Sequence, residues 1–251
     1  MVNSLTLPFS LKQLRLPVMR AHWEDVAQQA QVHHWTYPEY LATLCEKEMA
    51  SKEQERIKRN IAEAKLPIGK ALDAFDFSKT SSINAAQISA FAENTQWITQ
   101  AQNLLIFGPS GVGKTHLAAA IGRRLIEKGV RVCFVKTTVL VQRLQEAYNQ
   151  RKLSDLLEKL ARYQLLILDD IGYVKKSEAE TSVLFELIAD RYESKSLLIT
   201  SNQSFEQWDA IFPNNIMAVA AIDRLVHHAT IININEQSYR RASKLNSMGK
   251  Q

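Results

Sequence analysis

The most constraining feature of this chain is a glycine-rich turn with the spacing GxxxxGKT, namely Gly108-Pro109-Ser110-Gly111-Val112-Gly113-Lys114-Thr115. The turn follows the apolar run 103–107 and precedes the apolar run 117–121. Glycines let a backbone approach a polyphosphate closely, and the start of the following helix attracts negative charge. Because the turn stands between a predicted strand and a predicted helix, it predicts a loop that holds the phosphates of ATP.

Individual residues of this loop have expected roles. Lys114 is expected to reach the β- and γ-phosphates, and Thr115 to ligate Mg²⁺ through its hydroxyl. His116, which follows directly, is included among the expected nucleotide contacts. The sequence therefore predicts ATP and Mg²⁺ as cofactors.

After the loop, short apolar runs alternate with stretches of helical periodicity. We expect strands at 104–107, 132–135, 165–168, 197–200 and 231–234, with helices between them. Such alternation is typical of right-handed βαβ units, which place helices on both faces of a parallel sheet. The predicted fold class is α/β, with a parallel five-stranded sheet flanked by helices.

The chain before this region has a different pattern. From residue 11 to residue 66 it lacks glycine and carries apolar residues at helical spacing, including Leu11, Leu14, Leu41, Leu44 and Met49. The helical pattern stops at Pro67. We therefore expect three parts: an N-terminal helical domain at 1–66, a linker and junction at 67–102, and an ATPase core with a short C-terminal helix at 103–251.

Two carboxylates end the predicted strand 165–168. Asp169 is the candidate for the metal side of a nucleotide site, and Asp170 for orienting or deprotonating the attacking water. Asn202 follows the next predicted strand, and parallel strands bring their carboxyl ends to one edge, so it is expected near Asp169. An ordinary strand end with solvated acids, and a turn asparagine, are the alternative interpretations.

Arg224 lies in the helix predicted before the last strand. A guanidinium group can stabilise transition-state charge on the γ-phosphate of a neighbouring subunit. A structural ion pair with Asp223 or Glu186 is the alternative, and the residues alone leave the two open.

Composition excludes several classes of protein. The two cysteines, Cys45 and Cys133, are far apart, so neither a disulfide framework nor a zinc site is indicated. Neighbouring histidines, as in His33-His34 and His227-His228, point different ways on a helix, which also disfavours a metal site. Residues 1–10 do not form a secretory signal and no apolar run is long enough to span a membrane. We expect a soluble, cytoplasmic protein.

Several segments together resemble the AAA+ ATPases of the IstB/DnaC-like group, with IstB-like transposition helpers the closer match. They are GPSGVGKTHLA at 108–118, LLILDDIGY at 165–173, LLITSNQ at 197–203, AIDRLVHHA at 221–229, NEQSYRRAS at 235–243 and the junction ALDAFDF at 71–77. The resemblance implies a P-loop AAA+ core in which Asp169 is the Walker B acid, Asp170 the hydrolytic acid, Asn202 sensor 1 and Arg224 a finger acting in trans.

The chain departs from the wider AAA+ pattern in two ways. Aspartate stands at residue 170, where many members have glutamate, and its shorter reach is expected to slow hydrolysis. The chain also ends soon after the last predicted strand, so little or no C-terminal lid is expected. Whether Arg240 or Arg241 acts as sensor 2 therefore stays open.

The resemblance implies an ATP-dependent helper that oligomerises on double-stranded DNA and recruits or stimulates a transposase. Lys52, Arg56 and Arg59 share one helical face and are the candidate DNA contacts. Ion pairs with Glu48 and Glu55, one turn away, are the alternative. At the level of function, the alternatives are a DnaC-like replicative helicase loader and a small-molecule P-loop kinase, which the Asp169, Asp170 and Asn202 set disfavours.

Overall fold

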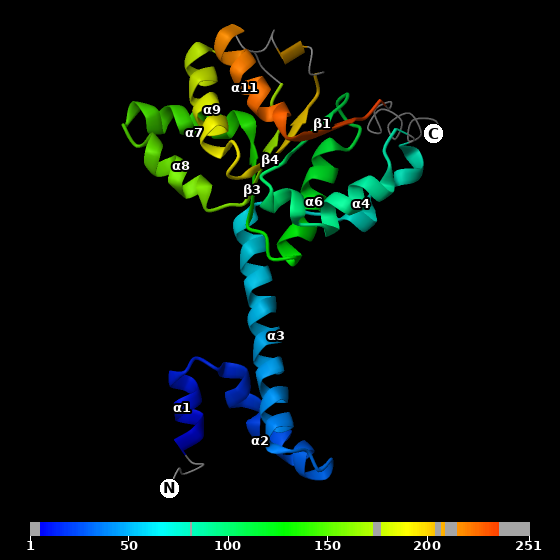
Figure 1. Ribbon diagram of the computed structural model, residues 1–251, viewed down its shortest axis with the longest axis vertical. Helices are drawn as coiled ribbons and strands as arrows, with labels where there is room; N and C mark the ends of the chain where they lie inside the picture. The colour runs from blue at the N-terminus through cyan, green and yellow to red at the C-terminus, as the bar shows by residue number, and fades with distance from the viewer. Residues whose placement is uncertain (1–5, 81, 173–176, 204–206, 209–214, 236–251) are drawn as a thin grey trace, which may run out of the picture. The chain divides into compact units, whose positions relative to one another are not determined.

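The computed structural model describes residues 6–80, 82–172, 177–203, 207–208 and 215–235 (Figure 1). Contacts within the chain form two compact units, an N-terminal unit, Met1–Arg59, and a core unit, Asn60–Gln251. No helix in the described ranges combines the length and the apolar character that crossing a membrane requires.

The N-terminal unit is helical, with α1 (Leu7–Gln13), α2 (Pro17–Val32) and the first part of α3 (Tyr37–Ala64). Its buried centre consists of Leu11, Met19, Val26 and Leu44. The helical periodicity correctly selected Leu11 and Leu44, but Leu14, Leu41 and Met49 are exposed by 57% or more. Three short helical segments can bury only one stripe of each helix, so apolar residues outside that stripe remain in water.

The buried carboxylate of Glu48 joins α3 to the start of α2. Its Oε2 atom accepts hydrogen bonds from the backbone N–H groups of Val18, at 2.8 Å, and Met19, at 3.0 Å. The first N–H groups of a helix have no acceptor within the helix, and a negative charge there is favourable. Glu48 thus stabilises the start of α2 from a distant part of the chain.

The core unit contains a five-stranded sheet in which every pairing is parallel, as predicted. The strands are β1 (Asn103–Phe107), β2 (Val132–Lys136), β3 (Leu165–Asp169), β4 (Ser196–Ser201) and β5 (Ala229–Asn233). Their order across the sheet is β2-β3-β4-β1-β5. The last strand begins two residues before its predicted start, because Ala229 pairs with Asn103 at the start of β1.

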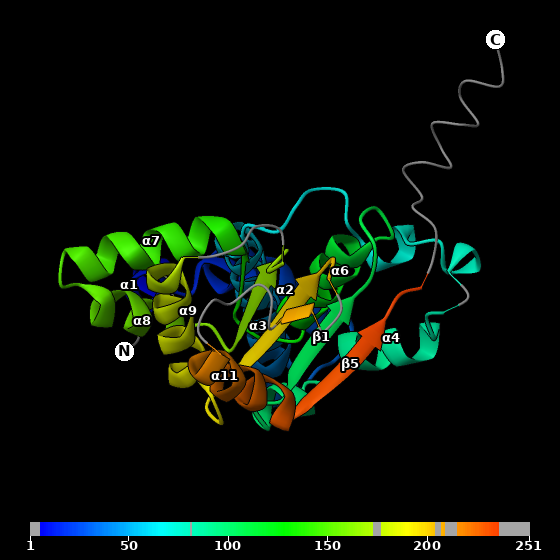
Figure 2. The same ribbon diagram turned by 90° about the horizontal axis from the view of Figure 1, so that it is seen from above.

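Helices cover both faces of this sheet (Figure 2). On one face lies α6 (Lys114–Glu127), whose Gly122 comes so close to Ile167 that a Cβ atom would be 2.7 Å from the isoleucine Cδ1. Leu105, Leu166 and Leu197 point to the other face and pack in one cluster with four further helices. These are α7 (Thr137–Asn149), α8 (Leu153–Ala161), α9 (Glu178–Arg191) and α11 (Asn215–His227).

The segment predicted as a linker, 67–102, lies within the core unit. It contains two single turns, η2 (Leu72–Ala74) and η3 (Phe77–Lys79), and the helices α4 (Ala85–Glu93) and α5 (Gln96–Thr99), with α4 packed on α6. Along the chain, the division between the two compact units falls between Arg59 and Asn60 rather than at residue 66. The assignment of functional domains along the chain stays a prediction.

Arg191, at the end of α9, is buried at the edge of the sheet where the strands begin. Its guanidinium donates to the carbonyl oxygens of Leu160, Tyr163 and Ser196, at 2.9–3.2 Å, and so joins the end of α8 to the starts of β3 and β4. Burial lowers the pKa of Arg191 to about 10, which leaves the group charged at neutral pH. The carbonyl oxygens compensate for part of its lost hydration.

Candidate nucleotide-binding site

The phosphate loop, residues 108–115, connects the end of β1 to the start of α6. Its lysine is buried to 8% exposure, and Lys114 Nζ donates to the carbonyl oxygens of Gly108, at 2.7 Å, and Pro109, at 2.8 Å. These bonds fold the side chain back over the phosphate loop. The ammonium group therefore lies on the concave side of the turn, where its positive charge would attract a phosphate.

Two glycines of the loop are required by its geometry. Gly108 has φ of +151° and Gly113 has φ of +100°, conformations that side chains disfavour. A Cβ atom at Gly108 would lie 2.5 Å from the carbonyl oxygen of Ile234, and one at Gly113 would lie 2.6 Å from Cε2 of Phe75. Ile234, which follows β5, and Phe75, which precedes α4, thus pack directly against the backbone of the loop.

The side chain of Asp169 is the centre of a hydrogen-bonded group at the end of β3. Asp169 Oδ1 accepts from the hydroxyl of Thr115, at 2.9 Å, and from that of Thr200, at 2.7 Å. The carboxylate is 6% exposed. Residues from the phosphate loop, β3 and β4 are therefore joined through one oxygen atom. Thr115 and Asp169 are the two residues that the sequence proposed for the metal side, and Thr200 is an addition from the structure.

Asp170 has an unusual backbone conformation, with φ of +64°. Its N–H group donates to the hydroxyl of Thr200 at 2.9 Å, and the carbonyl oxygen of Asp169 accepts from the hydroxyl of Thr137 at 3.1 Å. A left-handed conformation in a residue other than glycine is disfavoured and is sustained by such surrounding contacts. The two hydroxyls thus hold the turn in which Asp170 lies.

Asn202 follows β4 and lies against Gly172, a glycine that comes soon after the two aspartates in the chain. A Cβ atom at Gly172 would be 3.1 Å from Asn202 Oδ1. That oxygen is buried and has no hydrogen-bond partner among the described residues. A buried polar atom without a partner is uncommon, and the position of this one beside the turn after β3 leaves it available to a water or a ligand there.

His116 and Phe75 form a contact that the sequence did not predict. His116 Nε2 lies 2.7 Å from the carbonyl oxygen of Ala71, and its ring packs edge-on against Phe75, with the centroids 5.3 Å apart. Phe75 also contacts Phe77 at a centroid distance of 4.8 Å. The side chain of His116 is therefore engaged with the segment before α4, so any nucleotide contact from this residue would come from its backbone.

Residues 9–247 match the family model described as IstB-like ATP binding protein. The chain belongs to this IstB-like family. A protein of Sinorhizobium fredii named as an insertion sequence ATP-binding protein is 47% identical over 244 residues, which cover 97% of this chain and 82% of that protein. A protein of Geobacillus stearothermophilus, named for the insertion sequence IS5376, is 37% identical and covers 92% of both chains.

Solved structures agree with the fold. The DnaC helicase loader has a TM-score of 0.59 and 26% identity, and the match covers 66% of this chain and 97% of that one. DnaA from Aquifex aeolicus, solved with AMPPCP, has a TM-score of 0.56 and 19% identity, covering 74% of this chain and 58% of that one. The IstB-like chain thus has an AAA+ P-loop core and is an ATPase, as predicted.

Arg224 of this IstB-like core lies far from the phosphate loop. It is an exposed residue of α11, and it lines a small depression with Asn103, Lys195 and Leu197, which stand at or just before the starts of β1 and β4. The loop follows the opposite end of β1, and a five-residue strand is roughly 17 Å long. Among the described residues no carboxylate forms an ion pair with Arg224, so the alternative pairs with Asp223 and Glu186 are not present.

The candidate DNA-binding side chains of the IstB-like chain lie on α3, within the N-terminal unit. Lys52 pairs with Glu48 at 3.6 Å, as the ion-pair alternative predicted, and Arg56 pairs with Glu53. Glu55 pairs with Lys58 at 2.7 Å, so its predicted pairing with Arg59 is wrong. Arg240 and Arg241, the sensor 2 candidates, lie outside the described residues.

Proposed function

We propose that this chain is an ATP-dependent, DNA-binding transposition helper. It assembles as an oligomer on duplex DNA in its ATP-bound form and recruits or stimulates a transposase, and ATP hydrolysis controls the assembly. The insertion-sequence names of the relatives support this proposal, because those relatives share up to 47% of their residues over nearly the whole chain.

The position of Arg224 is the observation that supports the proposed oligomer. Arg224 lies beside the starts of the strands, whereas the phosphate loop and Asp169 lie at their ends. The side chain of one copy cannot span the sheet to its own nucleotide, so a role at the γ-phosphate requires a second copy. ATP then acts as a bridge between subunits, and loss of the γ-phosphate weakens that bridge.

The donor set at Asp169 fits a magnesium ion. Thr115 Oγ1 and Asp169 Oδ1 are hard oxygen ligands only 2.9 Å apart, and the carboxylate is bonded to hydroxyl groups rather than to a lysine or arginine. These two residues would hold Mg²⁺, which would neutralise charge on the phosphates when bound. Asp170 would orient the attacking water, and Asn202 would position it near the γ-phosphate.

Analytical ultracentrifugation with a long DNA duplex tests the proposal. The wild type is compared with Lys114→Ala and Arg224→Ala, with and without ATP and Mg²⁺; Arg162→Ala, which removes another exposed arginine, is the matched control. We expect ATP to drive a large DNA-bound assembly in the wild type and control, and both site variants to abolish it. A wild-type protein that stays monomeric and does not bind DNA would refute the helper function.

A replicative helicase loader is the second candidate, favoured by the likeness to DnaC. That likeness covers 66% of the chain, whereas the insertion-sequence relative covers 97%. Co-sedimentation of the full chain with a transposase or with a replicative hexameric helicase distinguishes the two. Binding to the helicase alone would favour the loader.

A further inference from the structure

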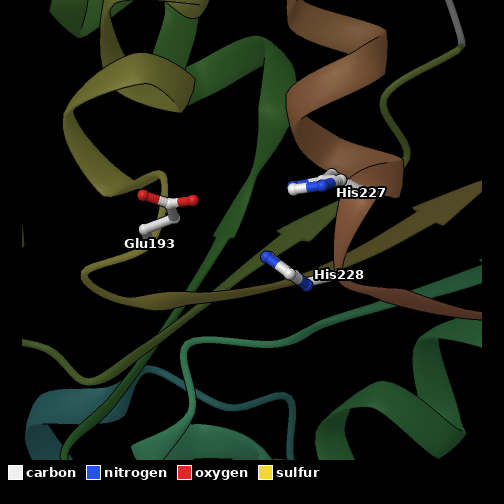
Figure 3. Close-up of side chains that lie close together, drawn as sticks. All are labelled: Glu193, His227 and His228. Atoms are coloured by element: carbon white, nitrogen blue, oxygen red, sulfur yellow. The ribbon is translucent and has the colours of Figure 1, made fainter.

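We propose that Glu193, His227 and His228 form a binding site for a divalent transition-metal ion of the zinc type. Each residue offers one ligand atom, and these atoms all lie within 4.8 Å of one another. Figure 3 shows the two imidazole rings at the end of α11. They face the carboxylate of Glu193, which belongs to the connection between α9 and β4. All three side chains are exposed, so an ion can reach them from solvent.

The two histidines converge because the helix ends between them. The sequence predicted that neighbouring histidines would diverge, but α11 ends at His227, and His228 belongs to the turn before β5. Their ring centroids are only 4.1 Å apart. Two imidazolium ions at this distance would repel each other, whereas two neutral rings can direct lone pairs to one cation.

Tyr192 orients one of these rings. Its hydroxyl oxygen lies 2.8 Å from His227 Nδ1. When Nδ1–H donates to this hydroxyl, the lone pair of the ring is on Nε2 and is free to take an ion. Such a hydrogen bond to the second nitrogen is usual for metal-binding histidines.

The ligand atoms select the type of ion. Arg224 and Lys195 line the same depression as Glu193 and His228, and their positive charges oppose any cation, so the ligand bonds must outweigh this repulsion. Two imidazoles and one carboxylate suit Zn²⁺, Ni²⁺ or Cu²⁺ rather than Mg²⁺ or Ca²⁺. Three protein ligands leave a fourth tetrahedral position for water.

A bound ion would fix the end of α11 to the connection before β4. Arg224 lies one turn before His227 on the same helix, so the ion would also restrict the position of this arginine. That consequence for subunit assembly rests on the proposed function, whereas metal binding itself does not.

Isothermal titration of the nucleotide-free full chain with ZnCl₂ tests the site. We expect one ion per chain, and at least tenfold weaker binding in His228→Ala and in Glu193→Gln. The double variant His33→Ala/His34→Ala is the matched control, since it removes the other exposed histidine pair, which has no third metal ligand grouped with it in the described part of the chain. Circular dichroism verifies that each variant is folded.

Two results would overturn the site. One is Zn²⁺ binding that is equal in the wild type, His228→Ala and Glu193→Gln; the other is binding that is lost in the His33 and His34 control. A final titration in MgCl₂ is expected to show no binding that depends on His228. If Zn²⁺ binds as expected but ATP-driven assembly on DNA fails, the metal site stands and the helper function does not.

Discussion

The hydroxyl of Thr200 donates a hydrogen bond of 2.7 Å to Asp169 Oδ1. The same hydroxyl accepts from the N–H group of Asp170 at 2.9 Å, and Thr200 is 1% exposed. One side chain of β4 therefore positions both aspartates at the end of β3. This makes Thr200 a positioning residue for the proposed magnesium site and for the proposed hydrolytic acid.

Replacing Thr200 with valine keeps the shape of the side chain and removes both hydrogen bonds. The loss of such bonds in a buried site costs about 1–3 kcal/mol, and the same loss from the transition state would lower ATPase activity about fivefold to 150-fold. Thr200→Ser retains the hydroxyl and should retain most of the activity. Steady-state rates across a range of Mg²⁺ concentrations measure the effect, and equal rates for both variants would contradict the role.

Asn202→Ala should lower the ATPase activity without a comparable loss of stability. Because Asn202 Oδ1 has no described partner, its removal should change stability by less than about 1 kcal/mol, while the ATPase rate should fall about a hundredfold if the amide acts on the reacting water.

Thr181→Val is the matched control for Asn202→Ala. The hydroxyl of Thr181 is also buried without a partner in the described structure, but it lies in α9. This variant should be neutral or slightly more stable and fully active. Thermal unfolding and ATPase assays of both variants test the pair, and a loss of stability in Asn202→Ala equal to its loss of activity would disprove a catalytic role.

Gly113→Ala should prevent ATP binding. The new methyl group would lie 2.6 Å from Phe75, and the positive φ adds about 1–2 kcal/mol of backbone strain. Binding of a fluorescent ATP analogue measures the loss. In a Phe75→Ala background the steric part of the defect should disappear and the backbone part should remain, so complete recovery would show that the φ angle is unimportant.

Glu48→Ala should loosen the start of α2. Two backbone N–H groups lose their acceptor, at a cost of about 1–2 kcal/mol, and amide exchange in the first turn of α2 should accelerate. Glu55→Ala is the control, because its ion pair with Lys58 is exposed and contributes about 0.5 kcal/mol or less. Hydrogen exchange followed by mass spectrometry compares the two, and equal exchange would contradict the capping role.

Arg59→Ala should weaken DNA binding more than Arg56→Ala does. Arg56 already has Glu53 as a partner, whereas no ion pair with Arg59 is present in the described ranges. Each lost phosphate contact should reduce the slope of log affinity against log salt by about one. Lys58→Ala, on another face of α3, is the control, and identical slopes for all variants would exclude this surface.

The sequence by itself determined the class of the core. The spacing GxxxxGKT, the apolar strands and the acids that follow 165–168 are local patterns, and the chemistry of a phosphate loop depends on neighbouring residues in the chain. These patterns were sufficient to predict the parallel sheet and an ATPase. The exposed positions of Leu14, Leu41 and Met49 were not predictable, because periodicity does not tell which stripe of a helix a neighbour covers.

Only the tertiary structure decided which distant residues meet. Thr200 reads as a minor interruption of an apolar strand, and its role depends on the pairing of β3 with β4. His228 and Glu193 come together because the end of α11 and the connection before β4 lie at the same edge of the sheet. That edge lies opposite the phosphate loop, so Arg224 is separated from its own nucleotide site. Such relationships arise from strand order and helix ends, which short-range sequence patterns do not encode.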